Sequence, residues 1–589
     1  MRHVKLSVIV ALFFGCLAGA LLMRAPAALA FSGSGAGTPL NPYKITTCAQ
    51  LEEVSNSLAA NYKLASSIDC SASMFTPIGS FSGTFDGGFN TISGVSAINL
   101  SGDHIGVFSF LAGATVSNLT ISDSSVEGLE YVGVLAGGTN GFGSVDHVAI
   151  TDSNAMGGAF IGGLLGSMFQ FSVSDSHTSN TTVNGENNSG LTDEIGGIAG
   201  EVNWSDVART YVLGGGVTGN IDDPTQSQYI GGFAGDDGNG STVTDSYSTA
   251  NVTGHNYVGG FSGRVNDTAY ATSYASGNVA GDNFVGGFTG GLYGGVLTDT
   301  FATGHVTGLI SGGLVGITDA GSPGQIISGA WDVTRSVQAN CVGDLQISIT
   351  CTGANVAGAA PNYFFNNHTN APLNTWDFTN LWRTNSADYP SFQTVPAALS
   401  DARITPAATS LTIAFGQADN GGSVLTSYEL QWGPSGGSLA DISGISPTTV
   451  TYTLNNLSTS TAYALKVRAI NAKGAGEWTT LNATTLAAIA ANNTSHNVVV
   501  SPPAKTISQP IITASSASAG ETTTAPTPEV AAPAPGLTPA TLRSPSASKQ
   551  TNSSPNPSSS SFNFAWLLVI PSGIVLVWLG VAIFGKTRP

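Results

Sequence analysis

The most regular pattern of apolar and polar positions in this chain is a six-residue unit. It consists of an aliphatic residue, two glycines, an apolar residue, a small residue and a glycine. The clearest copies begin at Ile161, Ile195, Ile230, Val258 and Val285, and variants begin at Ile105, Val132 and Ile310. From Gly231, the first glycine of the unit recurs at positions 259, 286 and 312. A repeat of roughly 20 to 50 residues is typical of solenoids, in which each unit buries its apolar face against its neighbours.

A second apolar pattern keeps the same period. One series consists of Tyr247, Tyr274 and Phe301, and another consists of Val252, Val279 and Val306. Equal spacing places equivalent residues above one another, because parallel strands of adjacent coils pair about 4.8 Å apart. The pattern predicts a parallel β-helix with interior ladders of Phe/Leu/Ile, of Tyr/Phe and of Val, and with two or three short strands per coil. The glycine pairs are expected to form turns through positive φ angles and to allow close backbone packing.

Further along the chain the pattern changes to plain alternation. Apolar residues alternate with polar ones over residues 411–415, 428–432 and 463–469, and glycine becomes less frequent. Short alternating strands over about 90 residues predict a β-sandwich. We therefore expect the β-helix over residues 31–397 and the sandwich over residues 398–487.

The N-terminal residues have the pattern of a signal peptide. Arg2 and Lys5 precede an apolar run, which ends near the small-residue pattern of Ala28 to Ala30. We expect residues 1–30 to be removed after export.

The C-terminal residues have a different pattern. Residues 488–561 are rich in Ala, Ser, Thr and Pro and contain no aromatic residue up to position 561, which predicts a disordered stalk. Residues 562–585 form an uncharged apolar run long enough for one transmembrane helix. Residues 586–589 contain Lys586 and Arg588 and are expected to be a cytoplasmic tail.

Composition narrows the possible partners. Charged residues make up 9% of the chain, Gly occurs 75 times, and the formal net charge is −18. This acidic balance argues against nucleic acid as a partner. Four cysteines follow the signal peptide, namely Cys48, Cys70, Cys341 and Cys351. An even number in an exported chain predicts disulfides. Pairing between nearest neighbours is the simplest connectivity, although the sequence leaves it open, and metal ligation is the weaker alternative because no CxxC occurs.

The repeat units resemble the GLUG motif, and the segment from Gly313 to Gly316 is the nearest copy. The resemblance covers roughly residues 36–395 and implies a bacterial surface or secreted protein, often an adhesin; it implies no catalytic residues. Residues 398–487 resemble a fibronectin type III domain. Leu457 and Tyr463 match its tyrosine-corner region, whereas Phe415 stands where this family usually has Trp.

The sequence offers weak candidates for catalysis and metal binding. Carboxylates that could serve a β-helix enzyme are Asp152, Asp175, Asp236, Asp237, Asp245, Asp282 and Asp299. Asp245 and Asp299 precede the Tyr/Phe series at equivalent places, which turn formation explains more simply. The run from Gly433 to Gly437 matches GxSxG without a following helix, and Asp237 to Ser241 resembles part of a calcium loop. We therefore predict no catalytic, cofactor-binding or metal-binding residues and no cofactor.

The expected fold class is all-β: a parallel β-helix, a fibronectin type III-like sandwich, a disordered stalk and one transmembrane helix. This order predicts a single-pass bacterial surface protein whose large N-terminal region faces outward. Our first hypothesis for the function of this protein is adhesin-like binding of an extracellular protein or glycan. The alternatives are a carbohydrate-active β-helix enzyme, which requires carboxylates gathered in one cleft, and a structural component of a surface layer.

Overall fold

The computed structural model describes residues 31–185, 193–220, 227–319, 321–344, 351–354, 363–386, 388–416 and 418–488. The predicted signal peptide, the stalk beyond its first residue, the transmembrane span and the tail lie outside the described residues. Within the described ranges, no helix is long and apolar enough to cross a membrane.

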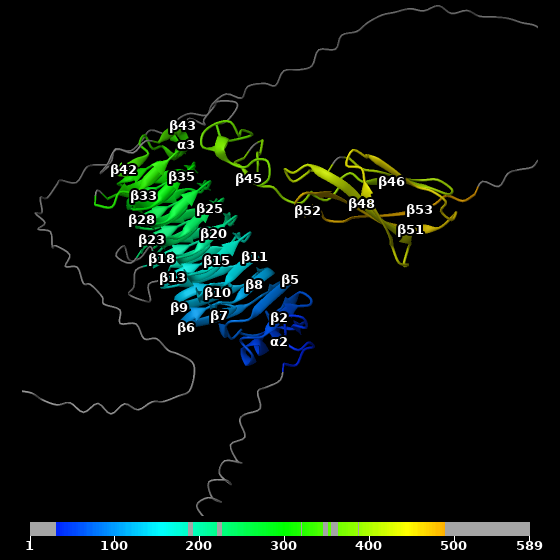
Figure 1. Cartoon of the computed structure of the whole chain (residues 1–589), viewed down its shortest axis with the longest axis horizontal. Helices are drawn as coiled ribbons and strands as arrows, with labels where there is room; N and C mark the ends of the chain where they lie inside the picture. The colour runs from blue at the N-terminus through cyan, green and yellow to red at the C-terminus, as the bar shows by residue number, and fades with distance from the viewer. Residues whose placement is uncertain are drawn as a thin grey trace, which may run out of the picture. The chain divides into compact units, whose positions relative to one another are not determined.

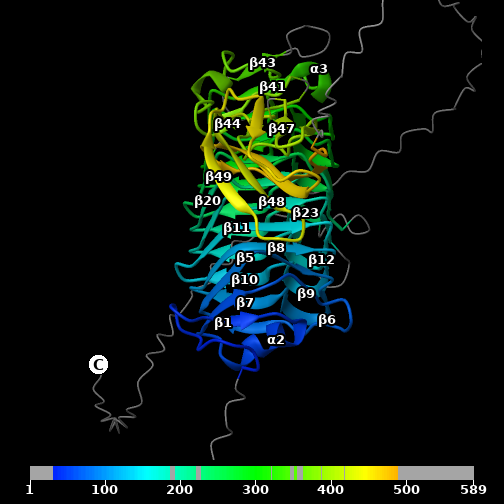
Figure 2. The same cartoon turned by 90° about the vertical axis from the view of Figure 1, so that its right-hand side faces the viewer.

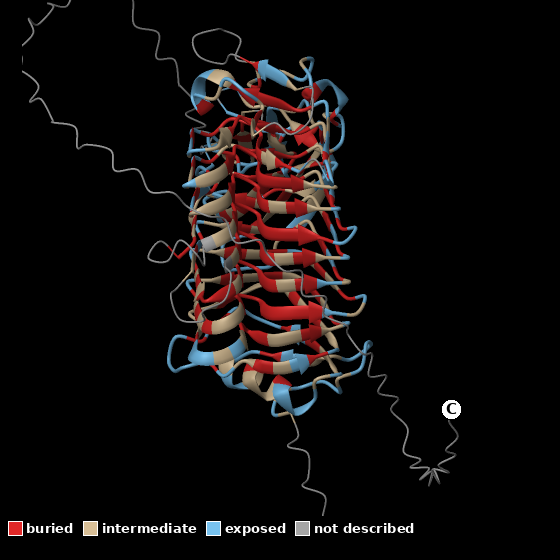
Figure 3. Ribbon diagram, turned by 90° about the vertical axis from the view of Figure 1, so that its left-hand side faces the viewer, coloured by how far each residue is buried: buried red, intermediate tan, exposed pale blue. Residues whose placement is uncertain are grey.

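Three parallel sheets wrap around one apolar core to form a solenoid, whose coils follow one another in sequence order from blue to green (Figure 1). Among the described residues the sheets contain 10, 14 and 19 strands, and we call them the ten-strand, fourteen-strand and nineteen-strand faces. The strands are largely buried and the exposed residues gather at the turns between them (Figure 3).

The strands of the ten-strand face are β4 (Ile78–Phe81), β7 (Phe108–Ala112), β10 (Ala136–Asn140), β14 (Leu165–Phe169), β19 (Ala199–Asn203), β24 (Ala234–Gly238), β29 (Ser262–Asn266), β34 (Thr289–Tyr293), β39 (Val315–Thr318) and β42 (Val342–Asp344). Those of the fourteen-strand face are β6 (Ser96–Ile105), β9 (Ser125–Gly133), β12 (Asn154–Gly157), β13 (Ala159–Gly162), β17 (Thr182–Gly185), β18 (Asp193–Gly196), β22 (Gly216–Thr218), β23 (Ser227–Gly231), β27 (Asn251–Thr253), β28 (Asn256–Gly259), β32 (Val279–Ala280), β33 (Asn283–Gly286), β37 (Val306–Thr307) and β38 (Ser311–Gly312).

Those of the nineteen-strand face are β1 (Tyr43–Ile45), β2 (Asn61–Leu64), β3 (Ile68–Asp69), β5 (Thr84–Ser93), β8 (Thr115–Ser122), β11 (Ser144–Thr151), β15 (Ser172–Ser174), β16 (His177–Ser179), β20 (Asp206–Ala208), β21 (Tyr211–Leu213), β25 (Thr242–Thr244), β26 (Tyr247–Ser248), β30 (Ala269–Ala271), β31 (Tyr274–Ala275), β35 (Val296–Thr298), β36 (Phe301–Ala302), β40 (Gln325–Ile327), β41 (Ala330–Asp332) and β43 (Thr352–Ala354). The middle coils thus contain five short strands each, more than the two or three expected.

Two of the three expected interior ladders are confirmed. Phe233, Phe261 and Phe288 are fully buried, and their rings stack at centroid distances of 4.4 and 4.8 Å. The Val252, Val279 and Val306 side chains are 1% exposed and belong to the same core. Stacking like on like keeps the apolar cross-section constant from coil to coil, which suits a straight solenoid.

The third expected ladder, the Tyr/Phe series, lies on the outer side of its sheet and not in the interior. Tyr247, Tyr274 and Phe301 point outward from the nineteen-strand face, because their neighbours Ala275 and Ala302 occupy the interior core. Side chains alternate between the two faces of a strand, so a series can be apolar, periodic and still lie outside. With the stacked His177, Tyr211 and Phe364 rings they form what we call the covered column.

The Tyr247, Tyr274 and Phe301 rings of the covered column are buried by the segment that follows the last coil, and Phe364, the last ring of the column, belongs to that segment. This segment, residues 363–395, contains η2 (Leu373–Thr375), β44 (Trp382–Arg383) and β45 (Ser391–Phe392). Trp376 and Trp382 pack against Tyr274 in a cluster separate from the solenoid interior. Tyr274 Oη donates a hydrogen bond to the Pro390 carbonyl (2.9 Å). We call residues 363–395 the closing segment.

The glycine pairs occupy the corner between the fourteen-strand and ten-strand faces, but not with the backbone that we expected. None of the glycines in the five clearest repeat units has a positive φ. A Cβ on Gly231 would lie 1.9 Å from the Ala234 carbonyl oxygen, and one on Gly263 would lie 2.4 Å from the Ile230 nitrogen of the adjacent coil. Close approach of backbones therefore explains this corner. The left-handed positions belong mostly to non-glycine residues at the other bends.

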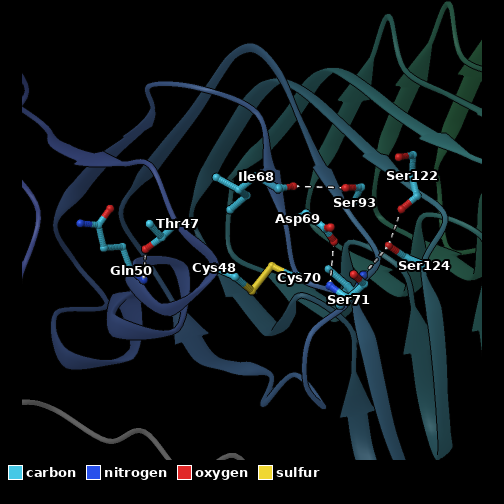
Figure 4. Close-up of a disulfide and its surroundings, with 11 residues drawn as sticks. Thr47, Cys48, Gln50, Ile68, Asp69, Cys70, Ser71, Ser93, Ser122 and Ser124 are labelled. Carbon is cyan, nitrogen blue, oxygen red and sulfur yellow. Dashed lines mark hydrogen bonds between the residues drawn. A yellow bond between two sulfur atoms is a disulfide. The ribbon is translucent and has the colours of Figure 1, made fainter.

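A short helix occurs at the N-terminal end, where only strands and turns were expected. Helix α2 (Cys48–Glu52) begins at Thr47, whose hydroxyl accepts a hydrogen bond from Gln50 N–H, and it continues into η1 (Glu53–Asn56). A disulfide joins Cys48 to Cys70 (Figure 4), and a second joins Cys341 to Cys351. Helix α3 (Val333–Ser336) lies between β41 and β42. The two cystines thus lie near opposite ends of the solenoid.

The second core belongs to a β-sandwich. One sheet consists of β46 (Arg403–Pro406), β47 (Leu411–Ala414) and β50 (Thr451–Leu454). The other consists of β48 (Leu425–Pro434), β49 (Ala440–Ile445), β51 (Ala462–Asn471), β52 (Gly474–Ala475) and β53 (Thr479–Thr484). Phe415 is 3% exposed and packs against Tyr428, and Tyr463 Oη accepts a hydrogen bond from Ser458 N–H (3.0 Å), as in a tyrosine corner. The predicted sandwich is confirmed.

Candidate functional site: an aromatic pocket beside a carboxylate cluster

Most of the acidic residues that the sequence suggested as catalytic candidates lie in turns of the backbone. Asp152, Asp175, Asp245 and Asp299 all have φ between 48° and 51°, in the left-handed region that Asp and Asn tolerate better than most residues. Asp282 is exposed and pairs with His255 Nδ1 (2.6 Å). Turn formation therefore accounts for four of them, as the sequence suggested for Asp245 and Asp299.

Asp237 cannot serve as a calcium ligand on the surface. Its side chain points into the solenoid core between Val202 and Val265, and it is fully buried. Ser262 Oγ and Tyr270 Oη donate hydrogen bonds to Oδ2, whereas Oδ1 has no hydrogen-bond partner within the part of the chain that the structure describes. Burial raises the pKa of Asp237 to about 7. The calcium-loop alternative is wrong for this residue.

The GxSxG match is a hairpin turn. Strand β48 ends at Pro434, and Gly437 N–H donates to the Pro434 carbonyl (2.9 Å) before β49 begins. A nucleophile elbow requires a helix after the serine, and none follows in this described stretch.

One group of three possible metal ligands occurs among the described residues. Atoms of Asp146, His147 and Asp175 lie within 4.8 Å of one another on the outer side of the nineteen-strand face. Arg209 already binds Asp175 through Nε (2.8 Å) and Nη2 (2.6 Å), and Ser174 Oγ donates to Asp146 (2.6 Å). These contacts satisfy the carboxylates without a metal ion, and we assign no metal site here.

Aromatic residues form another column, at the edge of the fourteen-strand face. It contains His104, Tyr131, Phe160, Tyr229, Tyr257 and Phe284, all of which are half-buried. Its first three rings stack at centroid distances of 4.5 and 4.6 Å. We call this series the open column.

Glu194 interrupts the open column. It pairs in register with Tyr229 on one side and occupies the level above Phe160 on the other. Its Oε2 atom is buried and has no hydrogen-bond partner among the described residues. Burial, followed by the charges of Asp236 and Glu201, raises the pKa of Glu194 well above its usual range.

Glu201 and Asp236 lie beside Glu194 on neighbouring strands of the ten-strand face. Ser167 Oγ donates to Glu201 (2.9 Å), and burial raises the pKa of Glu201. Asp236 accepts two hydrogen bonds from Arg264, one of them from Nε at 2.7 Å. The Arg264 guanidinium lies 4.0 Å from the centroid of the Tyr229 ring. One arginine thus holds an aromatic ring and a carboxylate together.

The pocket next to this cluster has a volume of about 290 Å³. Its lining consists of Tyr229, Tyr257, Arg264, Asn266, Tyr293 and Ser322. We call it the tyrosine pocket.

Gly291 provides space for two of the rings. A Cβ at this position would lie 2.6 Å from the Tyr293 ring and 3.0 Å from the Tyr257 ring. The rings of Tyr257 and Tyr293 are 6.3 Å apart and inclined by 59°. Aromatic walls with a few fixed polar groups are the usual composition of a small-ligand site.

Sequence reasoning named Asp236 but missed Glu194, Glu201 and the tyrosine pocket. A usable signal existed for Glu194, because the residue before the aliphatic position of the repeat is aromatic in the units beginning at Ile161, Ile230, Val258 and Val285. A carboxylate in an aromatic series marks a departure from the structural pattern.

The similarities to curated proteins cover short stretches. Over 118 residues the chain is 43% identical to Halomucin of Haloquadratum walsbyi, a match that covers 18% of this chain and 1% of halomucin. Over 136 residues it is 34% identical to a protein of Evansella cellulosilytica described as a Gly-rich membrane protein, covering 20% of this chain and 15% of that protein. The chain thus matches only a small part of either relative.

The matches to solved structures also cover a small share of this chain. The FN1–FN3 domains of chicken CNTN1 share 14% identity, over 17% of this chain and 35% of that one, with a TM-score of 0.14. A structure described as a myokine shares 18% identity over 16% of this chain and 97% of that one, with a TM-score of 0.14. The sequence of residues 398–485 matches the fibronectin type III domain, and this part of the chain is a domain of that family.

Proposed function

We propose that this protein is an adhesin-like protein of the cell surface, which binds an extracellular glycan through the tyrosine pocket. The composition of that pocket carries the proposal. Aromatic rings stack on the apolar faces of sugars, while tyrosine hydroxyls, Asn266 and Ser322 can exchange hydrogen bonds with sugar hydroxyls. Arg264 is held in place by Asp236, so its remaining N–H groups are directed before a ligand arrives.

The chain order supports a place at the cell surface. The proposed export signal (residues 1–30), stalk (488–561) and membrane span (562–585) would hold the folded domains outside the membrane. The GLUG-like repeats and the two relatives, one of which is described as a membrane protein, favour the same location. The fibronectin type III domain then serves as a spacer between the solenoid and the stalk.

Binding of residues 31–488 to a glycan panel tests the proposal, since this fragment contains both the solenoid core and the sandwich core. We expect Tyr257→Ala to weaken glycan binding strongly. The matched control is Phe89→Ala, which removes a 79% exposed ring from the nineteen-strand face. Failure of the panel to bind, or equal binding by Tyr257→Ala, would contradict the proposal.

A carbohydrate-active enzyme is the second candidate, because Glu194, Glu201 and Asp236 gather at one place instead of being scattered. Glycoside hydrolysis requires one neutral and one ionised carboxyl group, and the raised pKa of Glu194 suits the neutral role. However, none of the three lines the tyrosine pocket. New reducing ends or unsaturated sugars released by the wild type, and lost in Glu194→Gln, would favour the enzyme over the binding protein.

A further inference from the structure

The tyrosine pocket continues into a row of outward-facing residues on the ten-strand face. Phe169, Asn203, Gly238, Asn266 and Tyr293 occupy the same outward position on successive strands from β14 to β34. Asn266 and Tyr293 also line the pocket. The row spans four coil steps, about 19 Å along the solenoid axis at the usual strand spacing. We call it the axial row.

Large exposed rings lie at the far end of the axial row, which is Phe169, and beside it. Trp204 is 57% exposed, Phe169 is 42% exposed, and Phe142, on the preceding coil, is 88% exposed. Trp204 has a left-handed backbone (φ 52°), and its ring lies near Gly240 of the next coil, where a Cβ would be 3.6 Å from the ring. Exposed rings on three successive coils are unusual for a surface without a partner.

The five residues of the axial row are uncharged, and two of them, Asn203 and Asn266, have amide side chains. Asn239 Nδ2 donates to Asn203 Oδ1 (2.9 Å), and Asn203 Nδ2 donates to Glu201, which fixes both amides. Gly238 has no side chain and is buried, because the Asn203 amide occupies the space above it, where a Cβ on Gly238 would lie 2.7 Å from Asn203 Oδ1. In a chain with a net charge of −18, an uncharged strip of rings and amides suits a neutral partner that has both apolar faces and hydroxyl groups.

We propose that the axial row and the rings beside it bind a linear, neutral polysaccharide that lies along the solenoid axis and ends in the tyrosine pocket. This inference rests on the proposed function and extends it from a pocket to a chain of sugar units. The Trp204 and Phe169 rings pack against sugars distant from the pocket, and the Asn203 and Asn266 amides bind hydroxyl groups between them. A row of groups at the coil spacing suits a repeating ligand because the coils repeat along the same direction.

Isothermal titration of the fragment 31–488 with neutral oligosaccharides of increasing length, from a disaccharide to the polymer, tests this proposal. We expect affinity to rise with length until the ligand spans the row. The Trp204→Ala and Phe169→Ala double variant should lose about tenfold in affinity for the polymer and almost none for the disaccharide. Phe89→Ala is the control for loss of an exposed ring, and circular dichroism confirms that each variant folds.

The outcomes separate the two proposals. Absence of binding to any glycan overturns the proposed function, and the axial row with it. Equal affinity for the disaccharide and the polymer, unchanged in the double variant, overturns the axial row alone and leaves the pocket. Asn203→Asp provides an independent check, because a negative charge in the row should favour a cationic polysaccharide over a neutral one. Unchanged preference in that variant would also contradict the axial row.

Discussion

Two columns of aromatic rings run along this solenoid, and they differ in what lies over them. In the covered column, Tyr274 and Phe301 are at most 3% exposed beneath the closing segment. In the open column, Tyr229 and Tyr257 remain half-buried and line a pocket, and Glu194 breaks the series. A periodic series of rings is thus a buried, stabilising column on one face and the accessible lining of a pocket on another. Coverage, rather than residue type, separates the two roles.

A substitution in the closing segment, which covers the buried rings, should produce the largest effect on stability. Trp382 is fully buried and packs against Tyr247, Tyr274, Trp376 and Phe392. We expect Trp382→Ala to lower the free energy of unfolding by about 3–5 kcal/mol, as for other buried tryptophans. Chemical denaturation measures the change. Phe160→Ala in the open column is the comparison, and an equal loss there would mean that coverage does not distinguish the columns.

The coils under the tyrosine pocket contain a buried acid that should make stability depend on pH. The Asp237 pKa of about 7 exceeds its ordinary value of 3.8, so the folded protein holds a proton that the unfolded chain releases. The free energy of unfolding should therefore fall by a few kcal/mol as pH rises from about 4 to 7. In Asp237→Asn this part of the slope should disappear. Denaturation at several pH values would contradict the assignment if both proteins showed the same slope.

Placing an aromatic ring at position 194, where Glu194 interrupts the series, should make the open column more like the covered one. Glu194→Phe replaces a carboxyl whose buried Oε2 atom has no hydrogen-bond partner among the described residues by a ring between Phe160 and Tyr229. We expect a gain of about 1 kcal/mol in the free energy of unfolding, the size of an aromatic pair. Glu194→Gln replaces the carboxyl by an amide without adding the ring and should gain less. A loss of stability in Glu194→Phe would show that the carboxyl has a structural role.

Removing single tyrosine hydroxyl groups should give the smallest and most specific difference between the two columns. Tyr274→Phe removes the buried hydrogen bond to Pro390 and should cost about 1 kcal/mol of stability. Tyr257→Phe should leave the melting temperature unchanged and weaken glycan binding. Calorimetry of both variants, with titration of the second, checks the pair. The reverse result would exchange the roles of the two columns.

Periodicity allowed the solenoid to be predicted, because equal spacing in sequence becomes stacking in space. It could not decide which side of a strand each series faces. Tyr274 and Val279 keep the same 27-residue step, yet one lies outside the coil and the other inside. The closing segment supplied the missing information. Its tryptophans mark it in the sequence, but the surface that they cover follows only from the register of strands such as β31 and β36.

The candidate site was less accessible to sequence reasoning. Glu194 and Asp236 are more than 40 positions apart in sequence, and their electrostatic contact depends on the fourteen-strand and ten-strand faces meeting at one corner. The pocket also depends on Gly291, whose importance lies in the side chain that it lacks. The sandwich was easier to predict from the sequence, because its core positions Leu465, Val467 and Ala469 alternate within one strand.

The glycine corner also limits how such a protein can evolve. A side chain at Gly231 or Gly263 would collide with the backbone of its own or the adjacent coil, so this corner cannot accept extra bulk. Elsewhere, equivalent serines are separated by 27 residues in one coil step and by 36 in another, with the register restored afterwards. Insertions and new binding residues can therefore accumulate at the other bends while the glycine corner keeps the coils aligned. The outer surface could therefore change repeatedly in evolution while the scaffold stays the same.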